Sequence, residues 1–182
     1  MSSGAGGLEA LLSALREEGG AIGAVLVART ELPAAQRHAG PPQIAAGGPR
    51  ARGREAEYEL LLEMILEGAR LHYGQPRVVA AADPDLALLL GDQLYALGLS
   101  RLAALGDLDA TAELADVISL VAQAHAVRSP ELADAVWQAG AAAIGWGATP
   151  ELHAAKALAR AHGSRAISAL LRAASAARSP AP

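Results

Sequence analysis

Apolar and polar positions alternate with helical spacing in the part of the chain that begins near residue 54. Between 54 and 73 the apolar residues recur every three or four positions, as on one face of a helix, and glutamates fill the positions between them. The apolar face holds Tyr58, Leu61, Leu62, Ile65 and Ala69, and the polar face holds Glu55, Glu59, Glu63 and Glu67. Because Gly74 and Pro76 end the pattern, we predict a helix over 54–73 that buries one side.

Later helix starts are marked by a capping side chain that precedes a proline. Asp83-Pro84, Ser129-Pro130 and Thr149-Pro150 have this form, and Asp107 or Asp109 supplies the cap after Gly106. The pattern predicts four further helices, over 84–104, 108–126, 130–146 and 150–177, with the last one interrupted near Gly163-Ser164.

The predicted helix 84–104 is apolar nearly all round, which is typical of a helix in the middle of a bundle. It contains Gly91 and Gly98, which are seven residues apart and so lie on one face. Glycine within a helix costs about 1 kcal/mol relative to alanine, so we expect a neighbouring backbone to approach closely at both positions.

The N-terminal part of the chain has a different composition. Residues 7–19 predict a short helix, residues 21–28 fit either a helix or a strand, and 29–54 are rich in proline, glycine and arginine, as linkers are. We therefore expect an all-α, single-domain helical bundle of about five to seven helices over 54–178. A flexible N-terminal arm with a short helix and a linker (1–53) precedes it, and a disordered tail (179–182) follows it.

Composition narrows the class of protein further. Leucine and alanine dominate, phenylalanine is absent and aromatic residues make up 3% of the chain, so the core suits close contact between helices. With no cysteine, disulfides and thiolate metal sites are excluded. The chain lacks a secretory signal and a transmembrane segment, which favours a cytoplasmic protein. The net charge is −4 and the acidic residues concentrate in the middle of the chain, which argues against nucleic acid as the main ligand.

Candidate ligand-binding residues lie on two of the predicted helices. Asp92 stands in the apolar helix 84–104, where it is either a metal or diphosphate contact or, as we favour, a buried structural carboxylate. Tyr95 and Leu99 lie on the same helix and are included as candidates. His125 shares a face with apolar residues of 108–126 and is either a ligand contact or a residue at the core or its rim.

The remaining polar residues predict neither a catalytic residue nor a metal site. The pairs Glu113/Asp116 and Asp107/Asp109 could each hold Mg²⁺ weakly, but capping and solvation explain them better. His72 and Tyr73 end a helix, where a histidine suits the helix dipole. The chain has no phosphate-binding glycine loop, nucleophile elbow, zinc-protease motif or calcium loop, so nothing assembles a nucleophile with a base.

The segment 89–126 combines a Gly-Asp pair in a leucine-rich helix with a second predicted helix. The residues that carry the pattern are Leu89, Gly91, Asp92, Leu94, Leu102 and Ala103 in the first helix and Ala115, Ile118 and Gln123 in the second. In these positions the segment resembles the trans-polyprenyl diphosphate synthase superfamily. The resemblance is closer to the small, non-catalytic component of two-component heptaprenyl or hexaprenyl diphosphate synthases, and it implies that Asp92 is a helix-packing position. The DDxxD motifs that hold Mg²⁺ in catalytic members are absent, so the resemblance implies Mg²⁺ only where a catalytic partner is present.

Three functions remain open at this stage. The first is a non-catalytic subunit, or degenerate relative, of a polyprenyl diphosphate synthase that pairs with a DDxxD-bearing chain and helps to form the apolar groove for a prenyl chain. The second is a helical scaffold that assembles with itself and binds no small molecule. The third is a stand-alone prenyltransferase or lyase that would use Asp92, Glu113 or Asp116.

Overall fold

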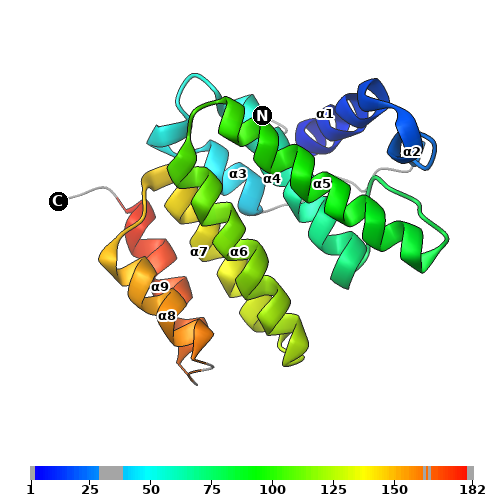
Figure 1. The fold of residues 1–182 in the computed structure, drawn as a ribbon. Helices are drawn as coiled ribbons and strands as arrows, with labels where there is room; N and C mark the ends of the chain where they lie inside the picture. The colour runs from blue at the N-terminus through cyan, green and yellow to red at the C-terminus, as the bar shows by residue number, and fades with distance from the viewer. Residues whose placement is uncertain (1–2, 29–38, 162, 164, 180–182) are drawn as a thin grey trace.

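Helices form every extended regular element in the computed structural model, which describes residues 3–28, 39–161, 163 and 165–179 (Figure 1). The seven longer helices in this part of the chain are α1 (Ser3–Glu18), α4 (Glu55–Tyr73), α5 (Pro84–Ala104), α6 (Leu108–Ala126), α7 (Pro130–Trp146), α8 (Pro150–Arg160) and α9 (Ala166–Arg178). Shorter turns of helix are α2 (Gly20–Gly23), α3 (Pro41–Ala46) and the 3₁₀ turn η2 (Pro49–Ala51). The predicted all-α bundle is confirmed.

The predicted helix starts are also confirmed, and most of the predicted caps form. The side chains of Asp83, Asp107 and Thr149 each accept a hydrogen bond from the backbone N–H three residues later. Ser129 makes no such bond, so α7 begins on its proline alone. The predicted interruption of the last helix falls between α8 and α9, and Ser164 lies outside the described residues.

The central helix is α7, and the prediction that 84–104 would be central is wrong. Twelve of the 17 residues of α7 are buried, against five of the 21 residues of α5. Leu88 and Leu89 on α5 face outward with exposed fractions of 45% and 64%. The apolar pattern of α5 does not predict this exposure, because the number of helices that pack around a helix depends on the tertiary arrangement. No helix in the described part of the chain is both long and apolar enough to cross a membrane.

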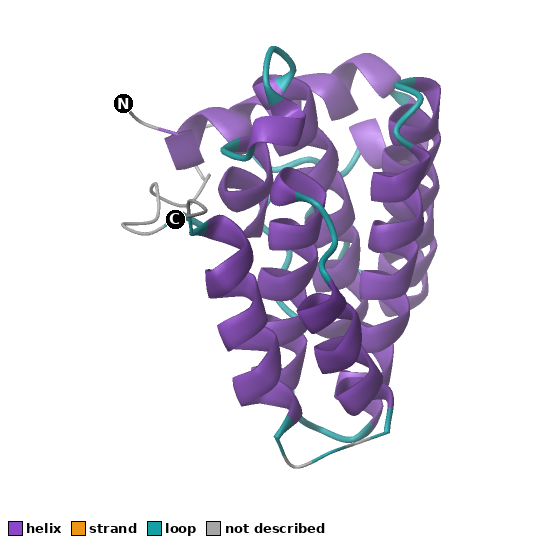
Figure 2. Ribbon diagram, turned by 90° about the vertical axis from the view of Figure 1, so that its left-hand side faces the viewer, coloured by secondary structure: helices purple, strands orange, loops and turns teal. Residues whose placement is uncertain are grey.

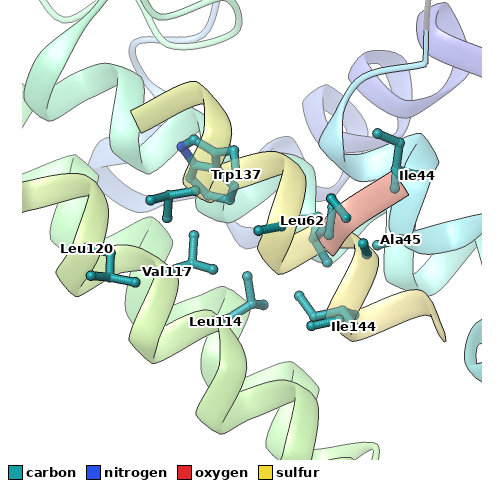
Figure 3. Packing of buried hydrophobic residues seen from close by; sticks show 14 of the residues in the cluster. Ile44, Ala45, Leu62, Leu114, Val117, Leu120, Trp137 and Ile144 are labelled. Atoms are coloured by element: carbon teal, nitrogen blue, oxygen red, sulfur yellow. The ribbon is translucent and has the colours of Figure 1, made fainter. Parts of the chain in front are cut away.

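Figure 2 shows the longer helices side by side, and their side chains form two cores. The larger core lies around α7, where Leu114, Val117 and Leu120 of α6 face it together with residues of α3 and α4 (Figure 3). The smaller core joins α1 to α4 and α5 through leucines of α1. Burial of these side chains supplies most of the driving force for folding.

Close approach of a neighbouring backbone is confirmed at Gly91, whereas at Gly98 the side chain of Ile65 fills the space and the nearest backbone atom, the carbonyl oxygen of Leu61, would lie 3.5 Å from the added Cβ. A Cβ atom added to Gly98 would lie 2.5 Å from Cδ1 of Ile65, and one added to Gly91 would lie 3.1 Å from the carbonyl oxygen of Gly68. The neighbouring helix at both positions is α4, and Gly68 itself lies opposite Gly91. Glycines on both helices therefore allow α4 and α5 to pack backbone to backbone.

Two N-terminal segments differ from the expectation. Residues 41–51, expected to belong to the linker, form α3 and η2, and Ala45 and Ala51 are fully buried against the larger core. Their prolines lie at helix starts, where proline is tolerated, so the composition resembled a linker. Residues 21–28 combine a turn of helix with a single antiparallel bridge between Leu26 and Val79. The expected linker residues 29–38 and tail residues 180–182 lie outside the described residues.

Gly145 offers a test of the packing around α7. Its added Cβ would lie 2.6 Å from the carbonyl oxygen of Ala45, so a methyl group must displace backbone. We expect Gly145→Ala to lower the free energy of unfolding by roughly 1–3 kcal/mol, measured by urea unfolding followed by circular dichroism. Gly6→Ala in α1, where the added Cβ meets open space, is the control and should be neutral or stabilising. Equal stability of both variants would contradict this packing.

Candidate functional site

Four aromatic and imidazole rings form a row from the middle of α5 to the C-terminal ends of α4 and α6. The ring of Tyr95 on α5 stacks on His72 with centroids 5.3 Å apart, and Tyr73 stacks on His125 of α6 at 4.4 Å. His72 and Tyr73 are adjacent in the last turn of α4, and their ring centroids lie 5.6 Å apart. The row therefore connects α4, α5 and α6 through contacts between rings.

Asp92 lies at one end of this row and is not the buried carboxylate that we favoured. Its side chain is 72% exposed, and its Oδ1 lies 3.2 Å from Nε2 of His72. Gly91 makes room for this imidazole, because a Cβ added there would lie 2.7 Å from the same Nε2. The position is exposed because it belongs to the outer face of α5, which the expected central placement of that helix concealed.

The structure brings three of the four predicted ligand-binding residues together. Asp92 and Tyr95 meet at His72, and His125 joins them through Tyr73. Burial, with smaller contributions from Tyr73 and Asp92, raises the pKa of Tyr95 above its usual range, so its hydroxyl stays protonated. Leu99 is half-buried against the larger core and takes no part in the row of rings. The role of these residues in ligand binding stays a prediction.

Sequence analysis missed a buried ionic network on α4. Glu63 and Glu67, assigned to the polar face of 54–73, are only 2% and 0% exposed. Oε1 of Glu67 accepts hydrogen bonds from the backbone N–H groups of Arg77, Val78 and Val79 at 2.6, 2.6 and 3.2 Å. The carboxylate thus holds the segment after α4 in place, as buried charges require hydrogen-bond partners.

Arg77 and Gln43 complete this network. The guanidinium of Arg77 donates to Glu63 and lies 3.7 Å from Oε2 of Glu67, while the amide of Gln43 donates to Glu59 at 2.8 Å. Burial raises the pKa of Glu63, although Arg77 and Gln43 act in the opposite direction. The network joins α3 and the segment after α4 to α4 itself, so its role is structural. The sequence predicts this network only weakly, because glutamates four residues apart are equally typical of a solvent-exposed helix face.

Lys156, which is the only lysine of the chain, anchors a second ionic cluster. It is 2% exposed, and its Nζ lies 2.7 Å from both carboxylate oxygens of Glu113 and 3.0 Å from Asp116. Asp116 also pairs with Arg160, and although burial raises its pKa, the hydrogen bonds from Arg160 and Lys156 outweigh burial and lower it. A cavity of about 580 Å³ adjoins the cluster, with Arg50, Asp109 and His153 on its wall. A fully paired ammonium is not poised as a nucleophile.

The acidic pairs considered for Mg²⁺ are engaged by protein groups. Asp107 accepts hydrogen bonds from the Tyr58 hydroxyl at 2.5 Å and from Arg50 at 3.0 Å. Burial and this contact with Asp107 raise the pKa of Tyr58 to about 12. Within the described residues no three or more metal-ligating side chains gather in one place. Glu113, Asp116 and Asp107 therefore serve as partners of cations and of a helix start.

The buried pair of Lys156 and Glu113 gives a stability prediction. Lys156→Met leaves Glu113 buried without its cation, so we expect a loss of about 3–5 kcal/mol in the free energy of unfolding, measured by chemical denaturation. The double variant Lys156→Met/Glu113→Leu should recover most of that loss, because it removes both charges. Arg160→Met is the control. Its side chain is 48% exposed, and we expect a loss below about 1 kcal/mol. Equal losses in all three variants would contradict the pairing.

Asp92 gives the opposite prediction. Since its side chain is mostly exposed, Asp92→Ala should change the free energy of unfolding by less than about 1 kcal/mol. Thermal unfolding at neutral pH measures this effect. A loss of several kcal/mol would mean that the contact with His72 is a major structural link between α4 and α5.

Comparison with known proteins adds no relative. No family model, no curated protein and no solved structure matches the chain. Any statement on function therefore rests on the geometry above and on the resemblance carried by residues 89–126.

Proposed function

We propose that this chain is a non-catalytic, cytoplasmic subunit or degenerate relative of the polyprenyl diphosphate synthases, and that it binds a catalytic chain through the outer face of α5. The observation that carries the proposal is the exposure of large apolar side chains on that face. Leu88 and Leu89 are 45% and 64% exposed, although α5 is otherwise packed on α4. Exposed leucines next to each other on a folded chain are typical of an interaction surface.

The outer face of α5 continues as a surface with little charge. Along this helix Ala96, Ser100 and Ala103 follow the two leucines outward, and Asp92 is the charged residue among them. On α6, which follows after a short turn (Figure 1), Leu108 is 69% exposed. Leu108 itself lies between Asp107 and Asp109, whose side chain is 92% exposed, so the surface with little charge is confined to α5. There, exposed leucine without much charge favours contact with another protein surface over contact with water.

Some of the residues that carry the resemblance to the polyprenyl synthases are buried on α5, and others are exposed. Of the residues that carry it, Gly91, Leu94 and Leu102 are buried and serve the packing of α5. Asp92 is exposed and contacts His72, so it is not the helix-packing position that the resemblance implied. Leu89 is also exposed, and packing inside this chain does not account for it. A surface shared with a partner would account for Leu89, and this supports α5 as the site of association.

The chemistry in this proposal belongs to the partner. A catalytic chain with DDxxD motifs would hold Mg²⁺ and the allylic diphosphate, since Glu113 and Asp116 of the present chain are paired with its own cations. The cavities described for this chain near Lys156 have charged walls and do not suit a prenyl tail. We therefore place the apolar groove at the junction of α5 with the partner, where Leu88 and Leu89 would form part of its wall.

The same observation favours a second candidate, in which α5 pairs with α5 of another copy in a homo-oligomer. This would be the scaffold function with no small ligand. The two candidates differ in what occupies the face, and one experiment separates them.

The experiment is an affinity purification of the tagged chain from lysate of its own source, with identification and quantification of what is recovered. We expect a DDxxD-bearing synthase at near-equal amount, and at least about tenfold less of it with Leu89→Glu, because a buried unpaired carboxylate disrupts an apolar interface. Leu171→Glu on α9 is the matched control, since Leu171 is also an exposed leucine at 46%, and it should retain the partner.

Other outcomes of this experiment are equally informative. Recovery of the bait alone as a defined oligomer that Leu89→Glu dissociates would replace the subunit proposal by the scaffold. Retention of the synthase by Leu89→Glu would contradict the assignment of α5 as the contact surface. Loss of it with both glutamate variants, at unchanged melting temperature, would also contradict that assignment.

A further inference from the structure

A second cavity lies where α4 and α6 end and α7 begins. Its volume is about 150 Å³, well below the 300–1,000 Å³ of sites for drug-sized molecules, so it has room only for a small ligand. Leu66 and Val121 supply apolar wall, and the indole of Trp137, which is 6% exposed, lies beside them. The polar groups on the wall include Arg70, His125 and Asp134.

Arg70 carries a charge that the described residues leave without a hydrogen-bond partner. Its Nη1 is enclosed and donates no hydrogen bond, and no carboxylate oxygen in the described part of the chain lies within 4 Å of the guanidinium. Burial and then the neighbouring Arg77 lower the pKa of Arg70, against the effect of Glu67, Glu63 and Asp134. Arg70 lines the cavity and forms no ion pair within the described residues, so a monoanion in the cavity would pair with the accessible part of the guanidinium, although not with the enclosed Nη1.

The start of α7 adds to the positive character of this cavity. Pro130, which has no N–H, lies on the wall as the first residue of the helix, and the N–H groups of Leu132 and Ala133 donate to the carbonyl oxygen of Ser129, so the start of α7 contributes its helix dipole rather than free donors. The N-terminal end of a helix attracts negative charge. His125 is half-buried and held by its stack on Tyr73, so its imidazole faces the same space from α6.

The exposed carboxylate of Asp134 limits which anion fits. A dianion such as phosphate would meet repulsion from Asp134, whereas a carboxylate carries one charge and can turn its apolar part to that side. Trp137, Leu66 and Val121 offer an apolar surface to such a ligand. The cavity therefore combines one cation with an apolar wall.

From this combination we infer that the cavity binds a small carboxylate with an apolar body, with the carboxylate at Arg70 and the start of α7 and the body against Trp137. The site is separate from the outer face of α5, and its ligand does not depend on a partner subunit. The geometry assigns His125 and Tyr73 to the rim of this site.

Trp137 makes the site measurable. The chain has two tryptophans, so Trp146→Phe leaves Trp137 as the only indole. We expect benzoate to change the fluorescence of that variant in a saturable way. Benzamide, which has the same shape without the charge, should bind at least about tenfold more weakly, because a hydrogen bond to a charged group is worth about 1.5–3 kcal/mol. Inorganic phosphate should also bind at least about tenfold more weakly than benzoate.

Two variants in the same background locate the binding. Arg70→Gln removes the cation and should lower the affinity for benzoate at least about tenfold. Ala133→Leu keeps every charge but fills the cavity from its α7 wall. If this variant folds with an unchanged circular dichroism spectrum, it should lower the affinity for benzoate as strongly. If Arg70→Gln does not fold, the Ala133→Leu variant and the comparison of benzamide with benzoate still test whether a carboxylate binds in this cavity.

Four results would overturn the inference. They are the absence of saturable benzoate binding, equal affinity for benzamide and benzoate, tighter binding of phosphate than of benzoate, and unchanged benzoate affinity in the folded variants. Equal affinity for benzamide would mean a merely apolar cavity, and a preference for phosphate would mean a site for inorganic anions.

Discussion

The helices of this protein approach one another through alanine and glycine, and the rest of the structure depends on that close contact. The chain has no phenylalanine, and Tyr58 and Trp137 are the large rings of the larger core, so most of that core is filled by bringing backbones together. Along α7, a Cβ added to Gly140 would collide with Val117 of α6, and one added to Gly145 would collide with α3. Tight packing restores the dispersion contacts that small side chains would otherwise forgo. It also lets α3, α6 and α9 all pack against one short helix.

The same close contact explains why charged groups lie between the helices. Where one helix carries glycine, a side chain of its neighbour can lie across it, as His72 does at Gly91 and Glu113 does near Gly140. Each polar group held there must find a partner, because burial of an unpaired charge is costly. Lys156 meets Glu113, and Arg77 meets Glu63. Arg70 has no such partner among the described residues, and the cavity beside it is where a ligand would supply one.

Local signals in the sequence predicted local structure well, and they failed where burial depends on distant segments. Proline after a capping residue predicted the starts of α5, α7 and α8, because both effects act within one turn of helix. The central position of α7 and the burial of Glu63 and Glu67 depend on neighbours from elsewhere in the chain. The same reason explains the candidate site. Asp92, Tyr95 and His125 were candidates from the sequence, whereas Arg70 was not, because nothing in the local sequence distinguishes it from other charged residues near a helix end.

One face of α5 is packed on α4, and the opposite face is exposed to solvent. Gly91, Leu94 and Gly98 bind α5 to α4, and these contacts are complete within the chain. Leu88 and Leu89 contribute little to that packing, since about half or more of each side chain stays in water. Polar residues at both positions would keep α5 on α4 and would be better solvated. Folding of the isolated chain therefore does not explain these leucines, and this is the reason for proposing that a second protein surface covers α5.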